Sequence, residues 1–378
     1  MIIYLIGSTR DLINWNFMDL NVLIFDMDGV LIDVSNSYRN TIQKTVDLYL
    51  GTCLGFKLKS NSPVTKEDIA LFKAAGGFNS DWDLTSGLLY YLFSLLPLPP
   101  FPKHPEFSSI LESVSFLRSK SSHITNETGT LYREKNIASF TKKVKASGGG
   151  LKGVRKVLGS SWEGWLFQSG DLTRTNLIKR IFQEIYLGNQ FTVFYRFPRL
   201  FYRGQGYYLQ EKLLISGRIL KDLRKRLRLG IASGRPRFEA ELALRRFHLF
   251  SYFDSLVTLD ECEAEETRMF RLTGKHKMFS KPHPYSLLKA IREVGLSHPR
   301  CGYLGDVVDD MKAAQAAKKT FPILAIGFLI ARNRRRGMTE SLFAAGADCV
   351  IENSKDLLRF VSLSSTERMK NAKACEKY

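Results

Sequence analysis

The sequence predicts an α/β protein in which a doubly wound parallel sheet is interrupted by a long, mostly helical insertion. The first observation is the apolar run Val22–Phe25, which ends abruptly in acidic residues, as a buried parallel strand does. The second is the regular alternation of strand and helix patterns after residue 211. The third is the stretch 35–211, whose patterns indicate helical pieces separated by loops.

The expected elements follow in chain order. The spacing of Tyr38, Ile42, Val46 and Leu50 predicts a helix over 35–50, directly after the first strand. Beyond the insertion, the patterns predict helix 212–228, strand 229–232, helix 236–247, strand 255–258, helix 284–294, strand 301–304, helix 310–317 and strand 322–326. In such a sheet, ligands bind at the carboxyl ends of the strands.

The predicted domains are an α/β core, an inserted helical cap and two terminal segments. The core comprises 18–34 and 212–363, the cap 35–211, the N-terminal extension 1–17 and the C-terminal tail 364–378. Within the cap, the stretches 97–105 and 119–150 lack an apolar period, so irregular and mobile segments are expected there. The glycine run that ends the second stretch, Gly148–Gly150, is interpreted as a flexible linker.

The composition excludes several classes of protein. The chain has 56 Lys and Arg against 37 Asp and Glu, and this net charge of +19 favours anionic partners by long-range attraction. Five scattered cysteines without a CxxC pair indicate neither a disulfide framework nor a structural zinc site. No signal peptide or membrane-spanning helix is recognisable, so a cytoplasmic location and no membrane partner are expected. The sequence does not indicate an oligomeric state.

Polar side chains follow the predicted strands at the points where the strands end. They are Asp26 and Asp28, then Ser233 and Gly234, then Lys281, then Asp306 with Asp309 and Asp310. Carboxylates gathered at one edge repel one another unless a cation lies among them, and oxygen ligands are those that Mg²⁺ prefers. Because Mg²⁺ usually takes one or two carboxylates together with a substrate phosphate, the sequence predicts a magnesium site for a phosphorylated substrate.

Two carboxylates separated by one residue allow a division of labour. One can attack phosphorus as a nucleophile, while the other protonates the leaving oxygen and later activates water. Gly29 allows the backbone to turn sharply, so that both side chains can face one pocket. Asp33 is interpreted as a helix-start residue rather than a catalyst.

These motifs resemble those of the haloacid dehalogenase-like (HAD) phosphohydrolase superfamily. The resemblance is carried by the segments 26–33, 232–236, 281–282 and 305–310, which stand in the order that the family shows. It implies Asp26 as nucleophile and Asp28 as general acid/base, with Ser233, Gly234 and Lys281 binding phosphate. It further implies Asp26, Asp306 and the backbone carbonyl of Asp28 as Mg²⁺ ligands, oriented by Asp309 or Asp310.

Segments 76–85 and 182–188 resemble a phosphoglycolate-phosphatase-like branch of that superfamily, in which a helical cap follows the first motif. Asn79, Asp81 and Trp82 are candidate substrate contacts in this cap, although a helix N-cap would explain the same residues. The expected function is a Mg²⁺-dependent phosphatase acting on a small phosphorylated metabolite of the phosphoglycolate or sugar phosphate type.

Two alternatives stay open. A phosphomutase would use the same aspartates but return the phosphoryl group to a sugar. A catalytically silent protein that binds anions or nucleic acid would explain the +19 charge. The basic cluster Arg332–Arg336 has no interleaved aromatic residues, and no nucleic-acid-binding module is recognisable, so no specific nucleic acid partner is expected.

Overall fold

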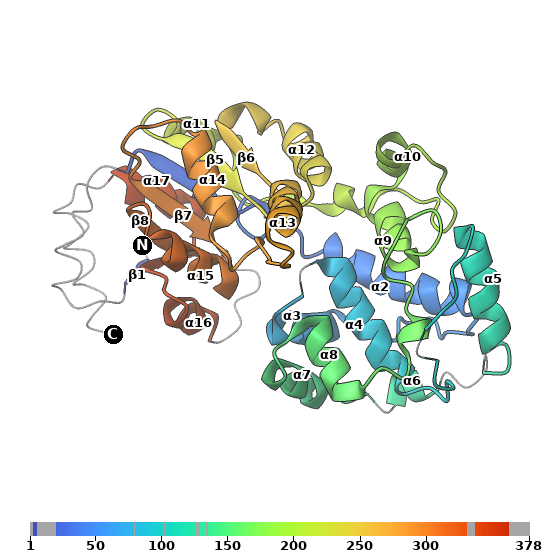
Figure 1. Ribbon diagram of the computed structural model, residues 1–378. Coiled ribbons are helices and arrows are strands. Elements are labelled where there is room, and N and C mark those ends of the chain that lie inside the picture. The colour runs from blue at the N-terminus through green and yellow to red at the C-terminus, as the bar shows by residue number, and fades with distance from the viewer. Residues whose placement is uncertain are drawn as a thin grey trace. The chain divides into compact units, whose positions relative to one another are not determined.

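The structure is a computed structural model that describes residues 3–5, 20–78, 80–101, 103–124, 129–133, 135–330 and 337–362 (Figure 1). The chain forms two compact units. One is built from Met1–Val34 and Lys212–Tyr378, and the other from Ser35–Glu211. The first unit contains the main sheet, and the second is almost entirely helical.

The first unit is built on a seven-stranded sheet in the order β1-β9-β8-β7-β2-β5-β6. Its strands are β1 (Ile3–Leu5), β2 (Val22–Phe25), β5 (Arg228–Ala232), β6 (Ser255–Val257), β7 (Cys301–Gly305), β8 (Ile323–Phe328) and β9 (Cys349–Ile351). Every pairing is parallel except that of β1 with β9. The predicted fold class is therefore confirmed, and β2 lies near the centre of the sheet with parallel neighbours on both sides.

Helices cover both faces of this sheet. Alternate residues of β2 point to opposite faces, and those on each face are apolar and pack against helices. Leu23 and Phe25 belong to a core cluster shared with α11 (Gly217–Leu223), α12 (Arg237–Arg246) and α17 (Ser354–Ser362). Val22 and Ile24 belong to a second cluster, shared with α14 (Tyr285–Glu293), α15 (Val308–Ala317) and α16 (Met338–Ala344). A small sheet of β3 (Ile32–Asp33) and β4 (Lys212–Leu213) lies at the junction with the insertion.

Several elements of the first unit differ from expectation. Within the predicted helix 212–228, the first two residues form β4 and the helix is limited to α11. Ser216 is the N-cap of α11, and its side chain accepts from the Ile219 N–H. α13 (Leu259–Thr273) was not predicted. Seven of its 15 residues are charged and only Cys262 is buried, so no apolar period marks it. Asp33 lies in β3 rather than at a helix start, and the 1–17 extension contributes the edge strand β1.

The second unit consists of helices that pack around aromatic residues. Its elements are α2 (Tyr38–Leu48), a π-helical turn (Tyr49–Cys53), α3 (Lys66–Ala75), α4 (Asp81–Phe93), α5 (Ile110–Ser121), α6 (Thr130–Arg133), α7 (Ile137–Ala146), α8 (Gly150–Leu158), α9 (Leu177–Leu187) and α10 (Asn189–Tyr195), with short 3₁₀ turns at Glu163–Trp165 and Tyr207–Gln210. Tyr38 of α2 stacks on Tyr186 of α9 with ring centroids 4.7 Å apart.

The expectation of irregular structure through 119–150 is wrong for its second half. α7 buries Ile137, Phe140 and Val144, and the Phe140 ring lies 4.6 Å from that of Tyr91. The glycine run is not a linker either, because its backbone packs directly on another glycine pair. The Gly150 N–H donates to the Gly76 carbonyl at 2.8 Å, and a Cβ on Gly150 would lie 2.0 Å from the Gly77 oxygen.

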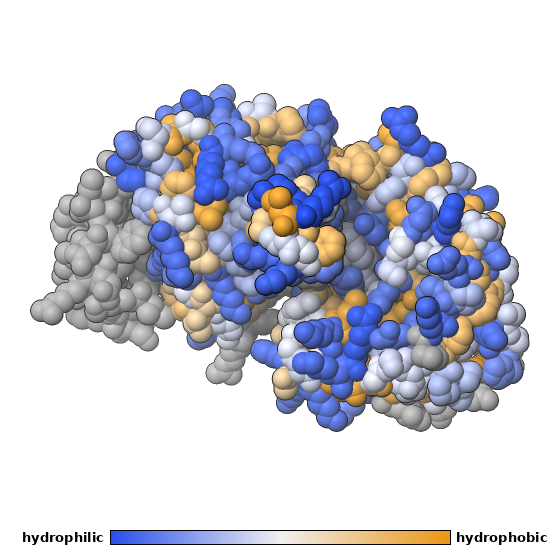
Figure 2. Space-filling view, viewed as in Figure 1, coloured by the Kyte–Doolittle hydropathy of each residue, from blue (hydrophilic) through white to orange (hydrophobic). Residues whose placement is uncertain are grey.

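Hydrophilic residues predominate on the face of the molecule shown in Figure 2, with hydrophobic residues scattered among them. Among the described residues, no helix is both long enough and apolar enough to cross a membrane. The predicted basic cluster Arg332–Arg336 and the tail 364–378 lie outside the described residues.

Candidate active site

The loop after β2 presents the first two carboxylates. β2 pairs with β5 and β7 so that Phe25 stands beside Ile231 and Leu304, and the Asp26 N–H donates to the Leu304 carbonyl at 2.8 Å. Asp26 is therefore the first residue beyond the carboxyl end of the central strand, and it is only 7% exposed. This position places its carboxyl group at the edge of the sheet where ligands bind in this fold.

The loop after β7 brings two further carboxylates to the same edge. One carboxylate oxygen from each of Asp26, Asp306 and Asp310 lies within 4.8 Å of the other two. Asp310 is fully buried, and both of its carboxylate oxygens are engaged. Oδ1 accepts from the Tyr303 hydroxyl at 2.8 Å, and Oδ2 accepts from the backbone N–H groups of Asp306 and Val307 at 3.1 and 3.3 Å.

Lys281 lies between two of these carboxylates. Its Nζ is 2.8 Å from Oδ1 of Asp26 and 2.7 Å from Oδ1 of Asp310. Burial lowers the pKa of Lys281, but these carboxylates outweigh it and hold that pKa well above its usual value. The side chain is therefore a permanent cation inside a cluster of acids.

Asp26 itself is held in a balance between burial and charge. Burial raises its pKa to about 7, with the charges of Asp310 and Asp28 adding to the rise and the charge of Lys281 opposing it. Without a further cation, this carboxyl group is therefore about half protonated at neutral pH. A carboxylate that is costly to ionise among other carboxylates is a site that favours a bound cation.

The two neighbouring acids of the last motif are separated by the fold. Asp310 joins the carboxylate cluster, whereas Asp309 is only half-buried and does not. Burial raises the pKa of Asp309, and the nearby charge of Lys312 opposes the rise. The contacts of Asp310 with Lys281, Tyr303 and the backbone suit an orienting role, because its oxygens are already occupied by donors.

Gly29 makes room for Asp306 against the first loop. Its φ is +77°, and a Cβ built on it would lie 2.0 Å from Oδ2 of Asp306. Only glycine therefore lets the Asp306 carboxylate approach the backbone of the Asp26–Gly29 loop. This close approach places the Asp306 carboxylate beside the loop that carries Asp26 and Asp28.

Replacing Gly29 with Ala is expected to displace Asp306 and lower activity by about 100-fold, the cost of a misplacement of about 1 Å. Gly274→Ala is the matched control, because Gly274 has a similar φ of +66° but nothing within 4 Å of its Cβ position. Both variants carry the same kind of backbone strain, so equal losses of turnover and of Mg²⁺ affinity in the two would contradict the role given to Gly29.

Ser233 lies at the end of β5, in the strand beside β2. It is 2% exposed, and its hydroxyl oxygen accepts from the backbone N–H of Arg235 at 3.2 Å. Gly234 has no atom within 4 Å of where a Cβ would stand, so the backbone here faces open space. Both predicted phosphate-binding residues are thus at the carboxyl edge of the sheet, next in order to Asp26.

Arg235 is a site residue that the sequence analysis missed. Its guanidinium is 1% exposed, and Nε donates to Oδ1 of Asp28 at 2.5 Å. A buried charge without a partner is costly, so this ion pair holds both side chains in place. Asp28, 30% exposed, therefore meets solvent on one side and a permanent cation on the other. The only signal in the sequence was the position of Arg235 two residues after Ser233.

The predicted contacts in the helical unit have structural roles there. Asp81 and Trp82 open α4, which is capped by the Ser80 hydroxyl accepting from the Asp83 N–H at 3.2 Å. The Trp82 ring lies under Lys179, with Nζ 4.5 Å from the ring centroid. Asn79 lies outside the described residues. Substrate contact by Asp81 and Trp82 stays a prediction.

A family model for haloacid dehalogenase-like hydrolases matches residues 128–318, about half of the chain. The chain belongs to the haloacid dehalogenase-like hydrolase family. Its predicted standing as an enzyme of the hydrolase class is confirmed. The matched range contains Ser233, Lys281, Asp306 and Asp310 but neither Asp26 nor Asp28, so the assignment of those two rests on the geometry above.

Other comparisons concern the fold or a short stretch of the hydrolase. An X-ray structure from the Northeast Structural Genomics Consortium shares 19% identity with a TM-score of 0.55, over 89% of this chain and 97% of that one. Phosphatase Tt82 from Thermococcus thioreducens shares 20% identity with a TM-score of 0.48, over 85% and 99%. A 70-residue stretch is 40% identical to an imidazoleglycerol-phosphate dehydratase of Phytophthora nicotianae, but it spans only 18% of this chain and 13% of that protein.

Proposed function

We propose that this hydrolase is a Mg²⁺-dependent phosphatase of a small phosphorylated metabolite, of the phosphoglycolate or sugar phosphate type, acting through an aspartyl-phosphate. The observation that carries the proposal is the contact of Asp26 with both a lysine and a carboxylate cluster at the carboxyl edge of the sheet. A nucleophilic carboxylate needs a neighbouring cation to face an anionic phosphate, and Lys281 supplies one.

In the first step, an oxygen of Asp26 attacks phosphorus and the bond between phosphorus and the ester oxygen breaks. Asp28 enters this step protonated and gives that proton to the leaving oxygen, so the alcohol departs neutral. In the second step, Asp28 takes a proton from water, the water oxygen attacks phosphorus, and the bond to Asp26 breaks. Inorganic phosphate is released and both aspartates return to their starting states.

The other residues hold the phosphoryl group and the two aspartates. Lys281 and the Ser233 hydroxyl offer a cation and a donor to the phosphate oxygens, and Arg235 keeps the Asp28 side chain in one orientation. The set of acidic oxygens fits Mg²⁺, which would be held by Asp26, Asp306 and the Asp28 carbonyl. When bound, the ion supplies positive charge that stabilises the transferred phosphoryl group.

The test is release of inorganic phosphate from a panel of small phosphate esters by the full-length protein, with Mg²⁺ and with EDTA. We expect release that depends on Mg²⁺ for at least one ester. Each reaction is also analysed for isomerised sugar phosphates. An isomer formed without net phosphate release would replace the phosphatase with a mutase, and absence of turnover on every ester would reject the proposal.

The affinity for Mg²⁺ is expected to depend on pH through Asp26. The ion binds the ionised carboxylate, and the pKa of Asp26 in the metal-free protein is about 7. Below that pH a proton must leave, so apparent affinity should fall about tenfold per pH unit, and above it affinity should level off. Isothermal titration between pH 5.5 and 8.5 measures this. The same slope in Asp26→Asn would assign the proton to another group.

A further inference from the structure

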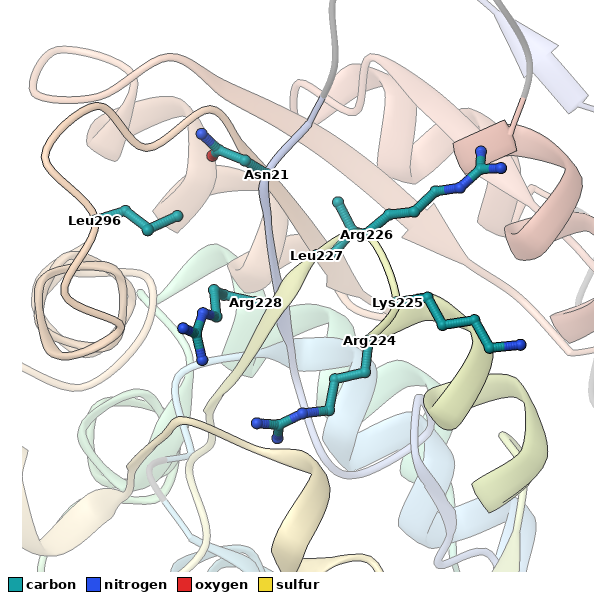
Figure 3. A pocket seen from close by; sticks show the side chains of 7 residues that line it. All are labelled: Asn21, Arg224, Lys225, Arg226, Leu227, Arg228 and Leu296. Carbon is teal, nitrogen blue, oxygen red and sulfur yellow. The ribbon is translucent and has the colours of Figure 1, made fainter.

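The edge of the sheet opposite the candidate active site carries a cavity with basic walls. Its volume is about 400 Å³, and it is lined by Asn21, the run Arg224–Arg228 and Leu296 (Figure 3). Arg228 opens β5 and stands beside Val22, the first residue of β2. The cavity therefore lies at the amino ends of the strands whose carboxyl ends lead to Asp26 and Ser233, within the same unit.

Acidic residues compensate only part of this charge. Oδ1 of Asp254 is shared by Arg224 at 3.0 Å and Arg228 at 3.2 Å, and Asp222 pairs with Lys225 at 2.7 Å. Arg226 is exposed and forms no ion pair with a carboxylate of the described residues. Among the described residues, four cations of the cavity thus face two acids, and the excess charge repels itself unless an anion binds.

The basic surface extends beyond the cavity along the edge of the sheet. Asn21 links Arg228 to Arg300. The backbone oxygen of Asn21 accepts from the Arg228 N–H at 2.9 Å, and Oδ1 of Asn21 accepts from the Arg300 N–H at 2.8 Å. Arg300 is exposed and directly precedes β7, two strands from β5. At about 4.8 Å between strands, the cations span roughly 10 Å, which is longer than one phosphate group.

We propose that this basic edge, formed by Arg224, Lys225, Arg226, Arg228 and Arg300, binds the phosphodiester backbone of a nucleic acid strand without reading its bases. Figure 3 shows Arg224 and Arg228 extending to one side, and Lys225 and Arg226 to the other. Side chains that diverge in this way cannot converge on one small anion, but they can contact successive phosphates of a chain.

The kinds of side chain around the cavity favour the phosphodiester backbone over a stacked base or a lipid bilayer as the ligand. None of the described residues that line the cavity is aromatic, so these residues offer bases no stacking platform and contact phosphates alone. Leu227 is buried and Leu296 half-buried, so neither can enter a lipid bilayer. Such binding accounts for part of the +19 charge that the acidic site leaves unexplained. It does not depend on the proposed phosphatase reaction.

The test is fluorescence anisotropy of labelled single-stranded RNA and duplex DNA of about 20 nucleotides, titrated with full-length protein at several salt concentrations. The variant is Lys225→Glu with Arg226→Glu, because both side chains are exposed and neither is needed for the Asp254 ion pairs. The matched control is Lys142→Glu with Lys143→Glu, two exposed lysines of α7 with the same change in charge. Thermal unfolding verifies that both variants are folded.

We expect wild-type protein to bind nucleic acid, with affinity falling steeply as salt rises. The edge variant should weaken binding at least about tenfold and reduce the salt slope by about two, one for each cation that no longer meets a phosphate. The control should change the affinity less than about threefold.

Three outcomes would overturn the proposal. They are no binding at low salt, equal weakening in both variants, and binding of tripolyphosphate or anionic vesicles in place of either nucleic acid. Each is measured apart from phosphate release, so failure here leaves the phosphatase proposal intact.

Discussion

Replacing Asp26 with Asn is expected to abolish phosphate release while the core stays folded. An amide oxygen is a poor nucleophile at phosphorus, and loss of a nucleophile typically lowers kcat by about 10⁴-fold or more. Asn keeps the shape of the side chain, and Lys281 keeps its second partner, Asp310. The measurement is turnover of the best ester with saturating Mg²⁺, beside thermal unfolding of the metal-free protein.

Asp26→Asn should also change how the free energy of unfolding of the metal-free protein depends on pH. Because the pKa of Asp26 is raised from 3.8 to about 7 in the folded state, its ionisation costs stability as pH rises through that window. Asp26→Asn removes this cost, so the metal-free variant should be at least as stable as the wild type at pH 8. Asp222→Asn, the same change in an exposed ion pair with Lys225, is the control. A fully active Asp26→Asn protein would reject the mechanism.

Replacing Lys281 with Met is expected to destabilise the core at alkaline pH and to impair activity. Lys281 pairs with both Asp26 and Asp310, and removing one partner of a buried ion pair typically costs about 3–5 kcal/mol. Methionine retains most of the apolar stem, so the loss reports the charge. Phosphate affinity should fall as well, because the cation facing the phosphate is lost.

The destabilisation should depend on pH. The charge of Lys281 lowers the pKa of Asp26, so removing it raises that pKa above about 7. A larger upward shift means that stability falls further as pH rises, so the difference from wild type should be greater at pH 8 than at pH 5.5. Urea unfolding in EDTA measures both values.

Lys289→Met is the matched control for this experiment. It removes a lysine from an exposed helix pair with Glu293, and such pairs typically contribute less than about 1 kcal/mol. Equal destabilisation by the two substitutions at both pH values would show that the charge of Lys281 does not support the cluster.

The gathering of the candidate site residues at one edge of the sheet could be predicted from sequence because strand ends are local features. Asp26, Ser233 and Asp306 each follow an apolar run, and parallel strands bring their carboxyl ends to one edge whatever the lengths of the connections between them. The role of the helical unit as a cap, the substrate and the partners stay predictions.

Other features escaped prediction because they depend on contacts between distant segments. Arg235 meets Asp28 across 207 residues of sequence, and no local pattern marks such a pair. The glycines at 148–150 were misread because their need for close backbone approach comes from Gly76 and Gly77, in another segment. α13 was missed because a mostly exposed charged helix has no apolar face to detect.

Patterns in neighbouring residues were enough to predict five parallel strands of the sheet (β2, β5, β6, β7 and β8), the order of the motifs and the residue types at the carboxyl edge, because apolar periodicity and strand ends are local features. β1 and β9 were not predicted. Which acid joins the cluster, and which cation meets which acid, depend on contacts that form only when the chain folds. Asp309 and Asp310 are adjacent in sequence, but successive residues of α15 point about 100° apart, since a helix has 3.6 residues per turn, and only Asp310 faces Lys281. Electrostatic energy depends on distance in space, which the fold alone sets.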